Sequence, residues 1–537
     1  MFSSAPQPVI DDTSPSERHP LFPFFFLIPG LVLIAFAAIQ VLKYHEISKG
    51  IALFGSGAVA LLCAAILFFP SRARAFATRD WIKRCTIGVA VLWGGWAALI
   101  AYVHRIDGWD EGAYFLSGLA LRGYDVPYAS HRPPITGLIC AVFVGWDRFL
   151  NPILAGALLV AVYLWVRRLL GPLYAMLALF VLLCQNLLLD STVDIMSELP
   201  AAIILFAGFF ALAEERFWWS ALWFALLGFA RWNLEPVSLV VLAAVFMRFG
   251  IRQALKFLGL SVVAFCAWYG FTVAMGTPHP ILRVIQGNLL AGPAFRPEQT
   301  NHFRILLKFY GSHFFFLTPP VLLALVANPI LNWRKRLPTQ LWVPLLVMPL
   351  ALLSYLGAML IFGGPFSRFM TPVIPAAVVS MMVGLSKFCE DHRLPNQIRM
   401  RIVTAALFLV CSMGLWPLDA IVHARVNHNT PGIFSAELRK KLLALDRTQP
   451  LYGVPRAPLC RNNGYPAMAE VRHTILFPTA ARDGFTHNYI EEPDSVEGAR
   501  KLAAACRSGD LMLIPKKFAS GFQVVFADGQ WALIRNP

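Results

Sequence analysis

The residue types that could do chemistry gather in one polar segment, residues 104–133. Its ionisable and aromatic candidates are Asp107, Asp110, Glu111, Tyr128, His131 and Arg132. Carboxylates at the start of a helix are often there only because capping and the helix dipole stabilise them. Here aromatic residues flank the acids, Pro133 and Pro134 pin the chain where the next helix starts, and His131 and Arg132 return beside the same surface. The segment is therefore a candidate reaction site.

The composition identifies the medium around this segment. The chain has 537 residues, of which 57% are hydrophobic and 14% are charged, and its mean hydropathy is +0.60. Soluble domains carry roughly 25% charged residues. These values exclude a string of soluble domains, a disordered chain, a disulfide scaffold and a nucleic-acid-binding module. The sequence predicts an α-helical polytopic membrane protein.

A bilayer-spanning helix needs about 20 apolar residues. Thirteen segments qualify, so we expect about 13 transmembrane helices, with interfacial helices in the first outer loop. They are residues 21–42, 50–70, 85–103, 151–170, 172–189, 195–213, 217–230, 235–250, 256–275, 312–331, 341–362, 369–388 and 401–421. The segments 217–230 and 235–250 are short, so they form either two spans or one broken hairpin.

The distribution of basic residues predicts the orientation. The net charge is +16, and dense basic loops recur on one side of the membrane, around residues 72–84, 167–168, 248–256, 334–336 and 387–401. Such loops are typical of the cytoplasmic side. The N-terminal tail, residues 1–20, is then cytoplasmic. The first outer loop 104–133, the large outer loop 276–311 and the tail lie outside.

The last part of the chain is polar and forms a separate unit. We expect a transmembrane domain over 21–421 and a small extracytoplasmic α/β domain over 422–537. Its predicted helices cover 433–446 and 495–506, its strands 450–454, 472–477 and 511–515, and a hairpin covers 522–535. Cys460 and Cys506 form either a disulfide or two free thiols. The absence of an Asn-x-Ser/Thr sequon favours a bacterial inner membrane with this domain in the periplasm.

Several motifs resemble one known family. They are Asp110-Glu111, Gly123-Tyr-Asp-Val-Pro-Tyr128 and His131-Arg-Pro-Pro134 in the first loop; Asp194-Ile-Met-Ser-Glu198-Leu-Pro200; Gly228-Phe-Ala-Arg231; and Gly364-Pro-Phe-Ser-Arg368 running on to Pro375. Together they resemble the membrane-embedded GT-C glycosyltransferases, nearest to the protein O-mannosyltransferases and the lipid A aminoarabinose transferases. The resemblance covers most of residues 84–400. The chain departs from the aminoarabinose enzymes at His131-Arg132, where they have Glu-Lys.

This resemblance implies an inverting transfer of a sugar from a polyprenyl-phosphate donor to a glycan, lipid or protein acceptor on the outer face. It implies that Asp110 is the general base and that Glu111 orients the acceptor or replaces a metal ligand. Arg132 and Arg368 are the candidates for neutralising the departing phosphate, since guanidinium groups match phosphate well. His131 is a hydrogen-bond partner or ligand. Glu198, Asp107 and Tyr128 complete the substrate-binding set. No cofactor is certain, and a divalent metal is an open option.

Other interpretations stay open. Arg368 either binds phosphate or only extends to the interface, and Glu198 either lines a cavity or is a structural acid. We expect Arg231 and Glu235 to form a structural ion pair, and His302, Lys308 and His313 to form a solvated surface. The rival functions are a lipid or polysaccharide flippase and a non-catalytic scaffold. The predicted spans hold few ionisable groups, whereas a transporter usually carries them near the midplane.

Overall fold

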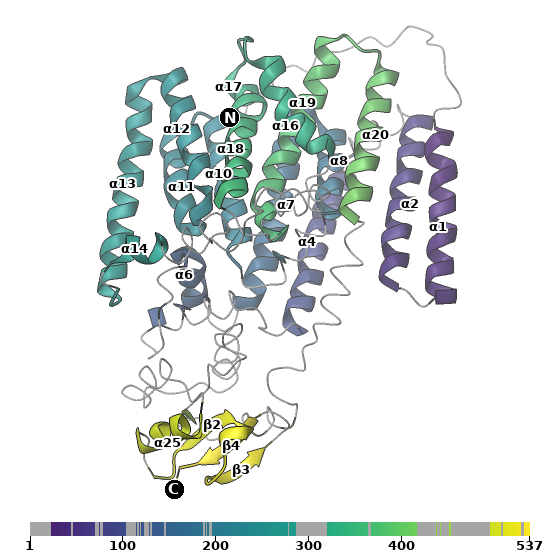
Figure 1. Ribbon diagram of the computed structural model, residues 1–537. Coiled ribbons are helices and arrows are strands. Elements are labelled where there is room, and N and C mark those ends of the chain that lie inside the picture. The colour runs from purple at the N-terminus through teal and green to yellow at the C-terminus, as the bar shows by residue number, and fades with distance from the viewer. Residues whose placement is uncertain are drawn as a thin grey trace.

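The fold is described from a computed structural model. It covers residues 23–44, 47–69, 75, 79–103, 114, 117–118, 120–122, 128, 132–143, 147–185, 188, 191–192, 196–277, 279–285, 319–362, 367–415, 437, 441, 451–452, 495–505, 508–527 and 531–536. The molecule is a bundle of apolar helices with a small sheet beyond one end (Figure 1).

The helices of the bundle follow the predicted segments closely. They are α1 (Phe24–Tyr44), α2 (Ile47–Phe68), α4 (Asp80–Val103), α6 (Pro134–Val142), α7 (Asp147–Leu170), α8 (Pro172–Leu183), α10 (Glu198–Ala213), α11 (Phe217–Ala230), α12 (Glu235–Phe249), α13 (Ile251–Ala274), α14 (Pro280–Val284), α16 (Pro319–Asn332), α17 (Thr339–Trp342), α18 (Met348–Phe362), α19 (Ile374–Asp391) and α20 (Asn396–Leu415). In its described residues each predicted segment lies mainly on these helices, with 341–362 extending over α17, η4 (Val343–Val347) and α18 and 369–388 beginning on η5 (Ser367–Val373), which confirms the helical polytopic fold. Within the described residues, six helical stretches are long and apolar enough to cross a bilayer.

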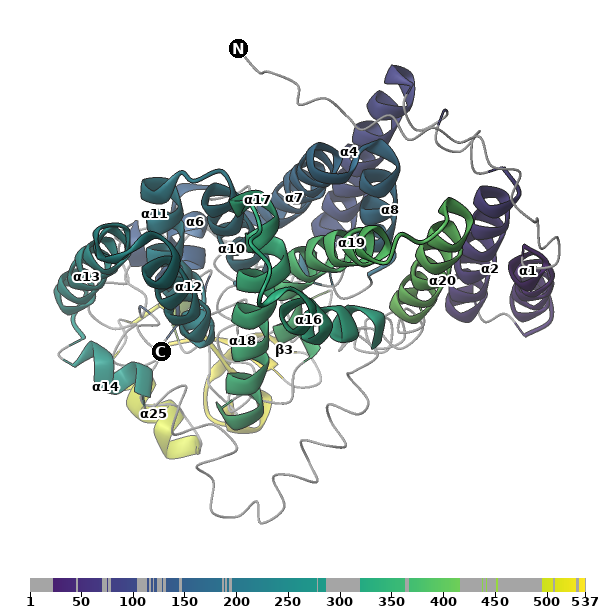
Figure 2. The ribbon, with the colours of Figure 1, turned by 90° about the horizontal axis from the view of Figure 1, so that it is seen from above.

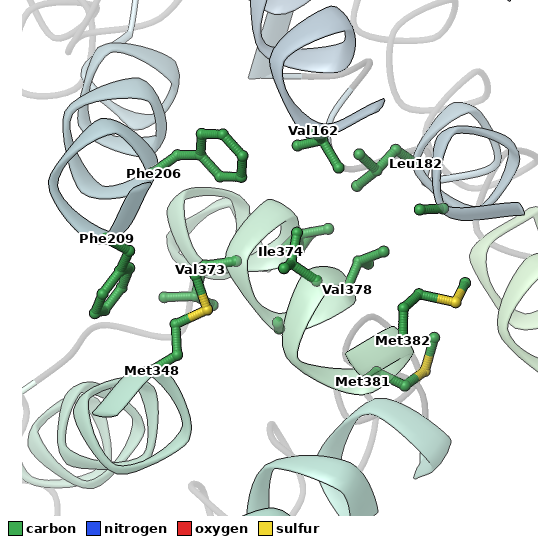
Figure 3. Packing of buried hydrophobic residues seen from close by; sticks show 14 of the residues in the cluster. Val162, Leu182, Phe206, Phe209, Met348, Val373, Ile374, Val378, Met381 and Met382 are labelled. Atoms are coloured by element: carbon green, nitrogen blue, oxygen red, sulfur yellow. The ribbon is translucent and has the colours of Figure 1, made fainter. Parts of the chain in front are cut away.

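Helix α19 is the centre of the bundle. Its apolar stretch is 89% buried, against 17% for α1 and α13 at the edges. Val378, Met381 and Met382 of α19 meet side chains from several surrounding helices, among them Val162 of α7 and Leu182 of α8 (Figure 3). A helix that is apolar all round needs such complete coverage by neighbours.

One continuous helix is widened by a π turn. Helices α17 and α18 are joined by η4 (Val343–Val347), a π-helical segment that contains Pro344. Proline lacks an N–H and clashes with the carbonyl one turn earlier, so the hydrogen-bond ladder must adjust there.

Five helices bring their basic or acidic ends together at one end of the bundle, which we call the basic end. Arg168 of α7 pairs with Glu214 after α10 at 2.8 Å, and Lys335 pairs with Asp391 of α19. Arg248 of α12 donates to the Leu337 carbonyl oxygen at 2.7 Å. Four of the predicted basic loops, around residues 167–168, 248–256, 334–336 and 387–401, therefore share one side.

The far end of the bundle carries α6, α14 and, beyond them, the sheet (Figure 1). The sheet has strand order β1-β2-β4-β3, from β1 (Leu451–Tyr452), β2 (Leu511–Pro515), β3 (Gln523–Ala527) and β4 (Trp531–Arg535). β1 is parallel to β2, and the other pairs are antiparallel. Helix α25 (Val496–Ala505) packs on it through Ala499 and Ala503.

The structure therefore confirms the predicted helix near 495–506, the strand 511–515 and the final hairpin. The predicted strand at 472–477, most of the predicted helix 433–446, and both Cys460 and Cys506 lie outside the described residues. The domain boundaries stay a prediction.

Candidate active site

A buried ion pair joins two helices at the far end. Glu198 is the first residue of α10, and Arg231 directly follows the last residue of α11. Arg231 Nη1 lies 2.9 Å from Glu198 Oε1, and their side chains are 8% and 2% exposed. Arg231 also donates to Ser197 Oγ at 2.9 Å. A buried charge is tolerated only when it is paired and hydrogen-bonded, and both conditions hold here.

Aromatic groups enclose this pair. The Arg231 guanidinium lies over the Phe369 ring, 4.4 Å from its centroid. The Tyr355 hydroxyl donates to the Phe369 carbonyl oxygen at 2.6 Å. Tyr355 and Tyr114 both lie close enough to interact electrostatically with Arg231. Four chain segments therefore meet at Arg231: the first polar segment through Tyr114, the start of α10, the middle of α18, and η5 (Ser367–Val373).

A second polar contact holds η5 in place. The hydroxyls of Ser191 and Thr371 lie 2.7 Å apart, and both side chains are buried. Helix η5 also packs along α10. This contact anchors the backbone of η5, which includes Arg368, at the same end of the bundle as the Glu198–Arg231 pair.

The helix lengths set the depth of the pair. Helix α11 has 14 residues, which rise about 21 Å, whereas a bilayer core is about 30 Å thick. Since α11 starts at the basic end, it ends short of the far surface of a bilayer. Arg231 and Glu198 therefore lie below that surface, in a buried polar cluster surrounded by apolar helices, which we call the Arg231 cluster.

The predicted site residues fall into three groups. Asp107, Asp110, Glu111 and His131 lie outside the described residues. Arg368 lies on η5, where only its backbone is described. Arg132, Tyr128 and Glu198 have described side chains.

The three described residues differ in their surroundings. Arg132 is half-buried and immediately precedes the buried prolines that start α6. The Tyr128 ring meets Phe271 edge to face, with centroids 5.8 Å apart, and burial raises the pKa of its hydroxyl to about 12. Tyr128 therefore stays a neutral hydrogen-bonding group over the physiological range. Glu198 is a structural partner of Arg231, and its role in substrate binding stays a prediction.

The predicted ion pair between Arg231 and Glu235 is wrong. Arg231 adopts extended backbone (φ −162°, ψ 112°), and its side chain pairs with Glu198 of α10. Glu235 starts α12 after a short helical turn, and its Oε1 lies where a side chain on Gly228 would be. Glu235 was the predicted partner because it lies only four residues from Arg231 in the sequence. The packing of α10 against α11 instead brings Glu198 beside Arg231.

The sequence did not identify Arg231, Tyr114 and Tyr355 as parts of one cluster. The sequence did contain a signal for Arg231. Glu198 and Arg231 are opposite charges at the ends of neighbouring, otherwise apolar helices, and an acid in such a helix requires a partner. Nothing in the spacing of Tyr355 distinguishes it from a core aromatic residue.

Within the described residues, no group of three His, Cys, Asp or Glu side chains could hold a metal ion. The predicted carboxylates of the first loop lie outside the described residues, so the expectation about a divalent metal stays a prediction.

The architecture of the chain is similar to that of solved structures, although its sequence matches no family model. No protein-family model and no curated protein matches the chain in sequence. Among solved structures, the crystal structure of ArnT from Cupriavidus metallidurans bound to undecaprenyl phosphate is similar. Its TM-score is 0.57 at 13% identity, over 86% of this chain and 98% of the ArnT chain. The chain has the ArnT fold. The apo structure of the same ArnT gives a TM-score of 0.53 at 14% identity, over 84% of this chain.

The ArnT likeness confirms the GT-C-like fold that the sequence motifs predict. It extends over nearly the whole ArnT chain, so it includes more than a shared bundle core. At 13% identity the likeness concerns the fold, and the chemistry must be argued from this chain's own residues.

Proposed function

We propose that this protein is an integral membrane glycosyltransferase. It takes a sugar from a polyprenyl-phosphate donor and transfers it, with inversion, to an acceptor at the outer face of the membrane. Asp110 is its general base. The alternative is a lipid or polysaccharide flippase of the same fold.

The observation that supports this proposal is the contact between the first polar segment and the Arg231 cluster. Tyr114 stands four residues after Asp110, is 4% exposed, and interacts with Arg231. We propose on this basis that Asp110 acts on a substrate bound near the Arg231 cluster. The fold supports the donor class, because an ArnT structure of the same fold was crystallised with undecaprenyl phosphate.

The surroundings of the Arg231 cluster suit an amphiphilic donor. Apolar helices surround the cluster, so a polyprenyl chain can remain in hydrocarbon while its phosphate meets polar groups at the far end of the bundle. Arg132 and the η5 residue Arg368 are the cations we assign to that phosphate. Arg231 is excluded from this role because Glu198 already neutralises it.

The proposed reaction forms one bond and breaks one. Asp110 accepts the proton of an acceptor hydroxyl, and the oxygen attacks the anomeric carbon of the donor from the face opposite the phosphate. The bond from that carbon to the phosphate oxygen breaks, and the polyprenyl phosphate leaves with the electron pair. Glu111 orients the acceptor, and Arg132 and Arg368 stabilise the departing anion, which is the kind of preorganised charge that lowers such barriers most.

Replacing Asp110 with Asn tests the proposal. Loss of a general base typically lowers a rate about 10²–10⁴-fold. We expect D110N to lose product to that extent in mass spectra of envelope lipids and glycans, while its melting temperature and its binding of undecaprenyl phosphate stay as in the wild type. The matched control is D80N, the same change at an exposed helix start on the basic side.

Two results would overturn the proposal. Unchanged envelope products in D110N would favour the flippase, which does not need a base. Envelope lipids and glycans that are identical in cells with and without the gene would show that the protein transfers no sugar to them.

A further inference from the structure

A cavity lies at the edge of the bundle and does not include the Glu198–Arg231 pair. It has a volume of about 460 Å³ and lies between α11, α13, α14 and the start of α12. Its aromatic lining comes from Phe229, Trp232, Phe265 and Trp268, and its polar lining from Glu235 and Ser261. Figures 1 and 2 both have α13 and α14 side by side at the edge of the bundle.

The carboxyl group of this cavity, Glu235, pairs with no cation among the described residues. Within the described part of the chain, no side chain forms an ion pair or hydrogen bond with Glu235, and the nearby Arg231 is paired with Glu198. Helix α12 begins at Glu235, and its N-terminal dipole offsets part of the cost of the charge. The remaining cost of an anion at this depth would be removed by a cationic ligand.

The aromatic lining favours the same kind of ligand. Trp232 and Trp268 have ring centroids 5.2 Å apart, Phe229 lies 5.8 Å from Trp232, and Phe265 lies 5.6 Å from Trp268. Aromatic faces attract ammonium groups, and cages of such rings recognise them. A carboxylate beside several rings therefore fits an ammonium ion and disfavours a bare phosphate.

The cavity opens where the bundle presents apolar side chains to its surroundings. Val262 and Phe265 on α13 are 52% and 43% exposed, and Ile281 on α14 is 45% exposed. In a membrane these side chains face lipid, so a ligand would enter sideways and carry apolar chains.

A neighbouring cavity of about 380 Å³ continues the first one. The two share Ile281 and Ile285, and the second includes the polar groups of Tyr269 and His279. Both groups can donate hydrogen bonds to a phosphate oxygen. The pair of cavities therefore offers one place for an ammonium and an adjacent place for a phosphate.

From this arrangement we propose that the groove between α11, α13 and α14 binds a zwitterionic aminophospholipid, with the ammonium on Glu235 and the aromatic rings. The lipid lies on the outside of the bundle, and its binding site does not include the Glu198–Arg231 pair. The inference does not depend on glycosyl transfer, because the ligand is recognised by its headgroup charge.

Native mass spectrometry of the full-length purified protein tests this site. The probes are phosphatidylethanolamine, its N-acetylated derivative and phosphatidylglycerol, all with the same acyl chains. We expect the wild type to retain phosphatidylethanolamine at least about tenfold better than either other lipid, since both lack the ammonium. E235Q keeps the size of the side chain and should abolish this preference.

The control variant is E390Q, which removes one exposed carboxylate at the basic end. It should keep the preference, and so should D110N, which separates this site from the proposed reaction. Equal retention of phosphatidylethanolamine by wild type and E235Q would overturn the proposal, as would equal retention of the three probes by the wild type. The second comparison needs no variant, so it decides the matter even if E235Q does not fold.

Discussion

The two ends of the bundle handle charge in opposite ways. At the basic end, ion pairs are partly exposed: Arg168 is 49% exposed in its pair with Glu214, and Lys335 is 39% exposed in its pair with Asp391. At the far end, the Glu198–Arg231 pair is enclosed by protein, and Glu235 lines a cavity with aromatic rings and has no ion-pair partner in the described part of the chain. Water can compensate charges at the first end, whereas only protein or ligand can do so at the second.

This difference fits the two roles that we propose for the ends. Exposed pairs contribute little to stability and are screened by salt, and an excess of basic residues is typical of the cytoplasmic side, where we expect the basic end to lie. Buried charges are sensitive to every neighbour, because the local dielectric is low. A site that must stabilise a leaving phosphate benefits from the second environment.

The largest effect is expected from breaking the buried pair. R231M leaves Glu198 buried without a cation, which typically costs about 3–5 kcal/mol. Reversible unfolding in mixed micelles with SDS would measure it. The double variant R231M/E198L should recover most of the loss, since apolar replacement of a buried pair is often neutral. If R231M alone were as stable as the wild type, the pair would be less buried than described.

A second variant concerns the position of Glu235. A side chain on Gly228 would lie 1.6 Å from Glu235 Oε1, so G228A must displace that carboxylate. We expect a loss of about 1–3 kcal/mol in the same unfolding assay, the usual cost of overpacking. G228A/E235A should regain it, because the smaller side chain leaves room. A gain in stability for G228A alone, as in an open helix, would contradict the described packing.

Tyr355 tests the support around Arg231. Y355F removes the hydroxyl that donates to the Phe369 carbonyl oxygen and leaves the ring in place. The expected loss is about 0.5–1.5 kcal/mol, the usual net contribution of one intramolecular hydrogen bond. Y269F is the comparison, since Tyr269 is 38% exposed. Equal losses in the two variants would show that the Phe369 contact has no special weight.

The smallest effect belongs to the basic end. K335A removes one partner of the exposed Lys335–Asp391 pair, and Lys387 still lies 2.9 Å from Asp391. We expect a loss of at most about 1 kcal/mol, decreasing as salt rises toward 1 M. R231M should show no such salt dependence. Similar salt responses in both variants would remove the contrast between the two ends.

Much of the fold could be predicted from the sequence, because apolar runs in a bilayer have few alternatives to a helix. The described residues of all thirteen expected segments are mainly helical, and the hairpin at 522–535 is predicted by two short apolar runs with Asp528-Gly-Gln between them. The π turn at Val343–Val347 was not predicted, since Pro344 alone does not specify which adjustment the helix makes.

The candidate site was less predictable. Polar residues could be assigned to one side of the membrane, but their partners depend on which helices touch. Glu235 is the nearer acid to Arg231 along the chain, yet Glu198 is the partner, because α10 packs against α11 over much of its length. The roles of Asp110, Glu111, His131, Arg132 and Arg368 stay predictions.

The π turn has a consequence for any comparison with related chains. Each residue rotates a helix by about 100°, so one residue added within a turn changes the direction in which every later side chain points. Tyr355 lies eight positions past Val347 and faces Arg231 with the π turn in place. Deleting one residue from Val343–Val347 would restore the ordinary helical phase and turn the Tyr355 side chain away from Arg231. The chain would be only one residue shorter, and its hydropathy and net charge would hardly change. A one-residue gap at this point in an aligned homologue would therefore mark a different set of neighbours around the guanidinium.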